Sequence, residues 1–314
     1  MVPAHPNGFH GIYPATLCPF TRDGEVDEAA VARHVTDLAA VDGIVGVLCN
    51  GHAGENFLLS DAETRRVAEI VSGAIGDRAI VVSGVNREGS REAADLAREV
   101  VAAGADAIMV FPPNAWAAGQ DQRVALNHHR VIVEAVDVPV MLFQGPAASG
   151  FAYPPEVLAE LVRLPRVVAI KDGSWEVAAY EANRRLIKSV APHVAVMGSG
   201  DEHLFTSYVV GSEGSLVSLA VVIPETIVRL DRAVRAGDLA AARAAHEVIY
   251  PLAKAVYGIP PGSHATARLK TCLNLLGKLE NDRVRPPIGP LDGAEREMLR
   301  EALRQSGLLL PKAS

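Results

Sequence analysis

The sequence predicts a (β/α)8 barrel that carries a helical extension at its C-terminal end. Short apolar, β-prone runs alternate with segments of helical periodicity, and this alternation occurs eight times. The chain has 314 residues, whereas a barrel of this kind typically needs about 250, and the remainder has a helical pattern. We therefore expect the barrel to occupy residues 11–223 and the helical extension to occupy residues 224–310.

Eight runs rich in β-branched and other small apolar residues are predicted as strands. In chain order they are Ile12–Cys18, Gly43–Cys49, Ala79–Val85, Ala107–Phe111, Val138–Phe143, Val167–Ile170, Val194–Met197 and Gly214–Leu219.

The segments between these runs repeat their apolar residues with a helical period. They are Asp27–Ala40, Asp61–Gly76, Ser90–Gly104, Gln122–Val136, Pro154–Leu164, Glu176–Val190 and His203–Val210. Ser60 or Asp61 before Glu63, and Ser90 before Glu92, fit the pattern of helix caps. The extension is expected to contain helices at Glu225–Ala236, Leu239–Tyr257, Ser263–Leu276 and Gly293–Gly307.

The competing architecture is an open, doubly wound sheet. Such a sheet often carries a glycine-rich dinucleotide fingerprint after its first strand, and no GxGxxG pattern follows the first predicted strand here. The closed barrel is therefore the favoured fold.

Composition and charge narrow the class of protein. With 49% hydrophobic residues the chain can bury a large core, and a net charge of −7 without a Lys/Arg-rich run argues against nucleic acid as a partner. The first residues lack the pattern of a signal peptide, and no apolar run is long enough to span a bilayer. We expect a cytoplasmic enzyme with no membrane role.

The three cysteines, Cys18, Cys49 and Cys272, lie far apart in the chain and show no CxxC spacing. They support neither a disulfide framework nor a zinc site. We expect them to be small buried hydrophobic residues.

Lys171 is the first candidate catalytic residue. It follows the apolar run Val167–Ile170 and precedes Asp172-Gly173-Ser174, so it is predicted to lie where a buried strand enters a loop. Burial lowers the pKa of a lysine and makes its free amine available to attack a carbonyl group. The alternative is a structural lysine paired with a carboxylate, such as Asp172 or Glu55.

The other strand ends matter because barrel enzymes build their sites at that face. Strand two leads into the loop Gly51–Glu55, where two glycines flank His52-Ala53 and would let backbone amides approach an anion. Strand five ends in Phe143-Gln144, and strand eight ends near Ser218. An ordinary glycine turn is the alternative interpretation of the loop.

Three segments occur in the order and spacing of one known family. They are Ile12–Phe20, Gly51–Glu55 and Ala169–Asp172, and a late Arg285-Pro286-Pro287 adds to them. Over roughly Gly11 to Gly307 the chain resembles the N-acetylneuraminate lyase and dihydrodipicolinate synthase superfamily.

The resemblance implies a (β/α)8 barrel with a C-terminal helical extension, usually assembled as a tetramer. It implies that Lys171 forms a Schiff base with the ketone of a 2-oxo acid, and that the Gly51 to Glu55 loop holds the substrate carboxylate. It implies neither a metal nor an organic cofactor. The protonated imine would act as an electron sink shared by aldol cleavage, aldol addition and dehydration.

Departures from the family pattern concern proton transfer and the second substrate. Most members carry a tyrosine where this chain has Phe143, and phenylalanine cannot transfer a proton. In the synthase branch an arginine follows shortly after, yet Pro146–Ser149 contains none. The threonine pair of that branch is His52-Ala53 here. These departures argue against lysine biosynthesis as the task of this chain.

His52 is the candidate for the missing acid-base group, with a surface loop histidine as the alternative. Glu55 is expected to anchor its own loop rather than to act in catalysis. Gln144 is expected either to hydrogen-bond a substrate hydroxyl or amide, or to be a packed loop residue.

Trp116 and Phe143 would make the pocket more apolar than a sugar-acid site needs, which points to an aromatic or less polar second substrate. His128 and His129 lie within a predicted helix, away from the strand ends, and are expected at the surface.

Three classes of function remain open. The leading one is a Schiff-base lyase, either an aldolase or a hydro-lyase, that acts on pyruvate or another 2-oxo acid. The second is a dihydrodipicolinate synthase proper with an altered proton relay. The third is a non-catalytic relative that binds an oxo acid or amino acid. A homo-oligomer, tetramer or dimer, is expected in each case.

Overall fold

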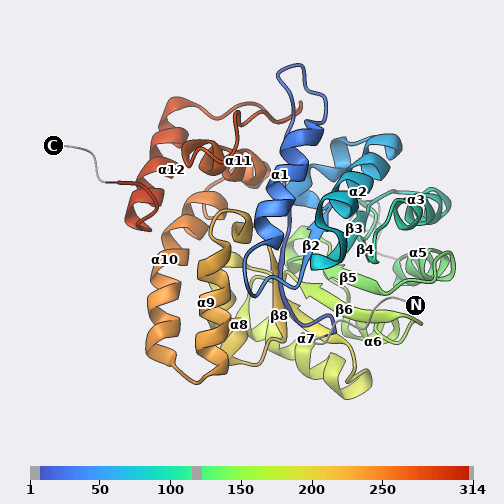
Figure 1. Cartoon of the computed structure of the whole chain (residues 1–314). Helices are drawn as coiled ribbons and strands as arrows, with labels where there is room; N and C mark the ends of the chain where they lie inside the picture. The colour runs from blue at the N-terminus through green and yellow to red at the C-terminus, as the bar shows by residue number, and fades with distance from the viewer. Residues whose placement is uncertain (1–7, 115–121, 311–314) are drawn as a thin grey trace.

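The computed structural model describes residues 8–114 and 122–310 and shows a barrel of eight parallel strands (Figure 1). The strands are β1 (Gly11–Pro14), β2 (Gly46–Cys49), β3 (Ile80–Val85), β4 (Ala107–Val110), β5 (Val140–Gln144), β6 (Val167–Asp172), β7 (Ala195–Gly198) and β8 (Gly214–Val217).

The sheet closes on itself. Each strand from β2 to β7 pairs in parallel with the next one in sequence, and β8 pairs with β1. Two parallel bridges, Ile12 with Ile44 and Ala15 with Leu48, join the β1 and β2 regions and complete the ring. The predicted (β/α)8 fold with a C-terminal helical extension is confirmed, because every strand is followed by helical structure on the outside of the ring.

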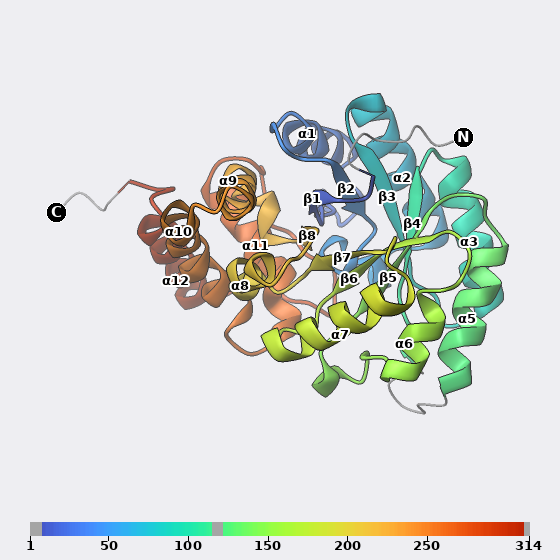
Figure 2. The ribbon, with the colours of Figure 1, turned by 90° about the horizontal axis from the view of Figure 1, so that it is seen from below.

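Helices surround the strands, as Figure 2 shows from below. In the barrel they are α1 (Glu28–Ala39), α2 (Asp61–Ile75), α3 (Ser90–Ala102), α5 (Gln122–Glu134), α6 (Pro155–Leu161), α7 (Val177–Val190), α8 (Leu204–Val209) and α9 (Pro224–Arg235). Within the described ranges, no helix is long and apolar enough to cross a membrane.

The extension contributes α10 (Leu239–Tyr257), α11 (Ala265–Leu275) and α12 (Gly293–Gln305). α10 runs beside α9, and α12 packs on α10 and α11 (Figure 1). Its apolar side chains share one core with the barrel, since Leu216 of β8, Ile249 of α10 and Leu299 of α12 belong to the same buried cluster. The division at residue 223 stays a prediction, because α9 holds the place of the eighth barrel helix and also packs against the extension.

The ends of two strands differ from the prediction in ways that affect the site. The first strand stops at Pro14, because the chain then crosses toward β2, where the Thr16 amide donates to the Leu48 carbonyl at 2.8 Å. β6 continues to Asp172, so Lys171 lies inside the strand and pairs with Phe143 of β5 and Met197 of β7. Pairing with the two neighbouring strands therefore fixes the backbone of Lys171 on both sides.

The expectation that His128 and His129 lie at the surface is wrong, because both are buried. Ser90 Oγ lies 3.1 Å from His128 Nδ1, and His129 lies 2.8 Å from the Ala125 carbonyl and 3.2 Å from the Tyr153 hydroxyl. The three cysteines are buried and free, as expected.

Candidate active site

A cavity of about 420 Å³ opens at the carboxyl ends of the strands and contains Lys171. Segments that follow β2, β5, β6, β7 and β8 line it, and residues at the end of α10 and in α11 complete its wall. This is the face where (β/α)8 enzymes place their chemistry.

Lys171 is 9% exposed, and burial lowers the pKa of its amine from 10.5 to about 8. The nearby Asp201 carboxylate acts in the opposite direction and favours the ammonium form. Within the described residues no ion pair involves Lys171. The two partners considered from the sequence are engaged elsewhere: Asp172 accepts from the Ser174 amide at 2.9 Å, and Glu55 binds Lys270.

Asp201 is a site residue to which the sequence reasoning gave no role. It begins the short 3-10 turn Asp201–His203 after β7, is 5% exposed and lines the cavity. One carboxylate oxygen accepts from the Leu219 amide at 2.8 Å. Burial raises the pKa of this carboxyl group to about 6, although the Leu219 amide and the Lys171 charge oppose the shift. Its position at the end of the seventh strand was the available signal.

His52 lies at the start of a 3-10 turn after β2 and is open to the cavity. Its ring packs against two phenylalanines, with centroid distances of 4.4 Å to Phe111 and 5.3 Å to Phe143. This apolar enclosure, together with the Lys171 charge, lowers the pKa of His52 to about 4. His52 is exposed through the mouth of the cavity, and because its pKa lies below the ordinary value of 6.5 the imidazole is mainly neutral at pH 7.

The loop that carries His52 is held in an unusual backbone conformation. Asn50 and Glu55, at its two ends, have left-handed φ angles of 54° and 57°. A Cβ atom at Gly84 of β3 would lie 2.1 Å from the Asn50 carbonyl oxygen, so only glycine lets the strand approach this closely. Because a 3-10 turn begins at His52, the amides of His52 and Ala53 have no acceptor within the turn.

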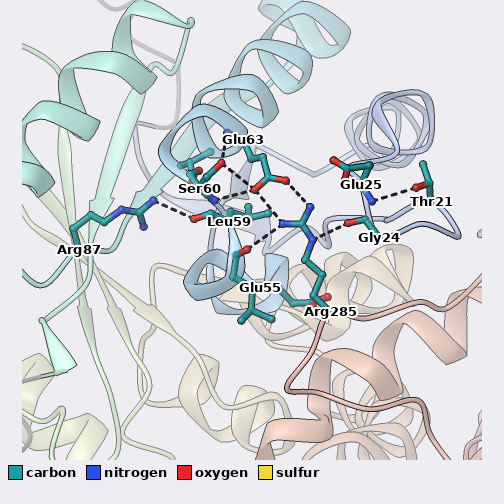
Figure 3. A network of polar contacts seen from close by, with 11 residues as sticks. Thr21, Gly24, Glu25, Glu55, Leu59, Ser60, Glu63, Arg87 and Arg285 are labelled. Atoms are coloured by element: carbon teal, nitrogen blue, oxygen red, sulfur yellow. Dashed lines mark hydrogen bonds and ion pairs between the residues drawn. The ribbon is translucent and has the colours of Figure 1, made fainter.

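The Glu55 side chain anchors this loop to the C-terminal extension, in agreement with the structural function expected for it. One oxygen accepts from Lys270 of α11 at 2.5 Å and the other from the Arg285 amide at 3.0 Å. Figure 3 shows how the Arg285 guanidinium continues the network, with Glu63 at 2.5 Å and the Gly24 carbonyl at 2.8 Å. The extension thus positions the loop from behind.

The predicted site residues divide into two groups. Lys171, His52, Ala53, Phe143 and Ser218 all line the cavity.

Three others do not line it. The carboxylate of Glu55 points to Lys270, and Gly51 precedes the turn. Gln144 is a packed residue, because its amide lies 3.5 Å from Asp172 and its oxygen accepts from the Tyr153 amide at 3.4 Å. The side chains of Glu55 and Gln144 therefore bond to protein groups, and Gly51 has no side chain, so substrate contact by these residues stays a prediction.

Aromatic side chains form much of the cavity wall, and local sequence patterns did not reveal four of them. Phe57, Phe151, Trp175 and Tyr257 join Phe143 there. The Tyr257 hydroxyl is buried, and Asp201 and Ser218 lie near it. Trp116, which the sequence also indicated, lies outside the described residues.

No group of three or more His, Cys, Asp or Glu side chains suited to a metal ion occurs in the part of the chain that the structure describes. The cavity contains the amine of Lys171, the carboxyl group of Asp201 and the imidazole of His52.

A buried lysine with a lowered pKa at the carboxyl face of a (β/α)8 barrel is suited to forming a Schiff base with a carbonyl substrate, which is the chemistry of the Schiff-base lyases. Comparison with known proteins specifies the family. The model of the dihydrodipicolinate synthetase family matches residues 8–306, and the chain belongs to this family.

Curated relatives span the whole chain. A 4-hydroxy-tetrahydrodipicolinate synthase from Hyphomonas neptunium is 32% identical over 96% of this chain and 99% of its own. One from Methanococcoides burtonii is 28% identical, with the same coverage. YagE from Escherichia coli K12, named as a candidate 2-dehydro-3-deoxy-D-gluconate aldolase, is 28% identical over 95% of this chain and 97% of its own.

Solved structures agree with this assignment. YagE, described as a prophage protein of the dihydrodipicolinic acid synthase family and crystallised with pyruvate, superimposes with a TM-score of 0.88 over 96% of this chain and 99% of its own, at 28% identity. A monomeric dihydrodipicolinate synthase variant reaches the same TM-score at 24% identity, covers 98% and 100% of the two chains, and supports the fold alone. The family, the fold and the expected lyase function are thereby confirmed.

Proposed function

We propose that the protein is a class I aldolase-type lyase in which Lys171 forms an imine with pyruvate or another 2-oxo acid. The observation that carries this proposal is the Lys171 amine itself, which is buried in the cavity, has a pKa lowered to about 8, and has no ion-pair partner among the described residues. The pyruvate complex of the relative YagE supports the choice of a 2-oxo acid.

The chemistry proceeds through an enamine. The free amine attacks the ketone carbon and water leaves, which gives a protonated imine. Loss of a proton from the adjacent carbon gives the enamine, which adds to an aldehyde in the condensation direction. In the cleavage direction, the bond between C3 and C4 of a longer substrate breaks and leaves the same enamine. Water then hydrolyses the imine and restores Lys171.

The loop after β2 would bind the acid. The amides of His52 and Ala53 have no acceptor within their turn and are suited to a carboxylate. The neutral His52 imidazole is available to accept a proton, and it replaces the hydroxyl that Phe143 lacks. Ser218 lines the same cavity and is a further candidate for substrate contact.

Borohydride trapping tests the proposal. The protein is incubated with a panel of 2-oxo acids and sodium borohydride, and the intact mass is measured. We expect one reduced adduct with pyruvate. Absence of an adduct with every acid in the panel would contradict the imine mechanism.

The second candidate function is 4-hydroxy-tetrahydrodipicolinate synthesis. The names of most of the relatives described above favour it. Phe143 in place of a tyrosine, and the absence of an arginine from Pro146–Ser149, oppose it. A non-catalytic oxo-acid or amino-acid binder is the third candidate, which retention of Lys171 in a reactive environment opposes.

We also propose a homo-oligomer, tetramer or dimer, located in the cytoplasm. Val124 and Val131 are 44% and 42% exposed and stand seven residues apart on α5, where a second copy would cover them. Light scattering coupled to size-exclusion chromatography measures the assembly, and cell fractionation measures the location. A strictly monomeric protein at micromolar concentration would refute the homo-oligomer. Recovery outside the cytoplasmic fraction would refute the cytoplasmic location.

A further inference from the structure

This inference rests on the proposed function and concerns the half of the substrate that lies away from Lys171. The cavity measures about 420 Å³, within the range of sites that enclose drug-sized ligands. Pyruvate alone would leave most of this volume unfilled. The residues that line the rest of the cavity therefore indicate the chemistry of the second substrate, the carbonyl compound that reacts with the enamine.

That wall is rich in aromatic rings. The chain has only seven phenylalanines, two tryptophans and six tyrosines, and five of these residues line this one cavity. They are Phe57, Phe143, Phe151, Trp175 and Tyr257. They come from separate segments of the chain, so their convergence is a property of the site and not of one apolar stretch.

Trp175 is the most informative of them. It follows β6 with a left-handed φ angle of 59°, which is rare for a bulky residue, and its side chain is still 40% exposed. A Cβ atom at Gly200 would lie 3.2 Å from the indole Cδ1, so the absence of a side chain at residue 200 leaves room for the indole. Tyr257 meets the indole edge-on at a centroid distance of 5.8 Å. Strained backbone of this kind gathers at ligand sites, and an exposed indole offers a face for stacking.

The charges in the cavity disfavour a second substrate that carries a negative charge. Among the described lining residues, Lys171 is the only lysine or arginine and Asp201 the only acid. The segment 115–121, which follows the lining residue Asn114 in the chain, reads AWAAGQD and contains no basic residue. Once Lys171 is consumed in the imine, a second carboxylate or a phosphate group would be desolvated without a cation.

We propose that the second substrate is an aromatic aldehyde whose ring stacks on Trp175. In the condensation direction, C3 of the enamine forms a bond to the aldehyde carbon, and the aldehyde oxygen takes up a proton. Hydrolysis of the imine then releases a 4-aryl-4-hydroxy-2-oxobutanoate and free Lys171. Cleavage of the same acid to pyruvate and the aldehyde is the exact reverse of these steps and needs no oxidant or reductant.

The test compares aldehydes of matched size and different chemistry. Pyruvate is condensed with benzaldehyde, cyclohexanecarbaldehyde, glyceraldehyde or succinic semialdehyde, and kcat/KM is measured for each. Benzaldehyde should exceed its saturated analogue by about two- to tenfold, the usual value of an aromatic pair. It should exceed succinic semialdehyde by more than about tenfold, because no lysine or arginine besides Lys171 is among the described lining residues. It should also exceed glyceraldehyde, because a short polyhydroxy chain has no ring to stack on the indole, although Ser199 and Thr266 give the wall some hydroxyl groups.

Variants of Trp175 locate the effect. Trp175→Leu should lower kcat/KM for benzaldehyde by about two- to tenfold and leave cyclohexanecarbaldehyde within about twofold, whereas Trp175→Phe should retain most of the preference. Pyruvate trapping by borohydride should be equal in all three proteins. A preference for glyceraldehyde or succinic semialdehyde, or an equal loss with every aldehyde in Trp175→Leu, would overturn the proposal.

A binding measurement separates this inference from the proposed function. Calorimetry with 4-phenylbutanoate and 4-cyclohexylbutanoate requires no imine. Tighter binding of the phenyl compound by the wild type, lost in Trp175→Leu, would support the aromatic subsite even if pyruvate trapping failed. Equal binding of both compounds by both proteins would refute the subsite.

Discussion

At the scale of single residues, Lys171 and Asp201 influence each other's ionisation. Burial lowers the pKa of Lys171 to about 8 and raises that of Asp201 to about 6. The two charges attract, so the Asp201 carboxylate keeps the pKa of Lys171 higher than burial alone would. Because only the free amine attacks a ketone, the rate of imine formation should rise with pH and level off above about 8.

Asp201→Asn removes the negative charge that favours the ammonium form. The pKa of Lys171 should fall, and the midpoint of the pH profile for pyruvate trapping should move to lower pH. The neighbouring Glu202→Gln is the matched control, since Glu202 does not line the cavity. An unchanged or higher midpoint in Asp201→Asn would show that Asp201 does not act on Lys171.

His52→Ala tests the proton-transfer function proposed for the imidazole. Turnover should fall by about 10²–10⁴, the usual value of a general acid-base group, while the imine with pyruvate is still trapped. His193→Ala, at an exposed position away from the cavity, should leave turnover unchanged. Normal turnover in His52→Ala would make His52 an ordinary loop histidine.

At the scale of elements, the extension holds the loop after β2 through a buried ion pair. Lys270 of α11 is 1% exposed and Glu55 is fully buried. Lys270→Met leaves the Glu55 carboxylate buried without its cation, and the free energy of unfolding should fall by about 3–5 kcal/mol. Chemical denaturation measures this change.

Two further variants make this experiment specific. Lys270→Met combined with Glu55→Gln should recover part of the loss, because no charge is then left unpaired. Arg232→Met, which breaks an exposed pair with Asp42, should cost no more than about 1 kcal/mol. A loss in Lys270→Met as small as that of Arg232→Met would contradict the anchoring function of the pair.

Local signals predicted the elements well. The capping box of Ser60 and Glu63 forms as expected, and α10 has the predicted bounds. The cap expected at Ser90 does not form, because Ser90 is the first residue of α3 and Gly89 holds the N-cap position. The sequence could have predicted that His128 and His129 are buried. Ala125, His129, Ile132 and Val136 repeat at helical spacing, and this period places the histidines on the buried face of α5.

At the scale of the whole molecule, the site depends on contacts that no local pattern contains. Glu55 and Lys270 are 215 residues apart in the chain, and Tyr257 enters the cavity from the end of α10. The sequence placed Lys171, His52 and Phe143 at strand ends because a barrel brings strand ends together. It gave Asp201 no function, although Asp201 follows β7 and β7 pairs with the strand that carries Lys171. It could not collect the aromatic rings, since their meeting depends on how the loops after several strands fold over the barrel and, for Tyr257, on how the extension closes over it.

The site also predicts that the protein will not behave as a dihydrodipicolinate-type synthase. A second substrate with a carboxylate lacks a bidentate partner, which costs on the order of 1.5–3 kcal/mol in binding. Phe143 in place of the tyrosine removes a further factor of roughly 10²–10⁴ in rate. Condensation of pyruvate with aspartate semialdehyde, coupled to the next reductase, should therefore be negligible. Activity within about tenfold of a genuine synthase would contradict this assignment.

The most direct measurement of the central claim is the position of the reduced pyruvate adduct. After borohydride trapping, the protein is digested and the modified peptide is sequenced by mass spectrometry. The account predicts one adduct on Lys171 in the wild type and none in Lys171→Ala, with both proteins equally folded. An adduct on Lys254 or Lys270, or one that persists in Lys171→Ala, would contradict it.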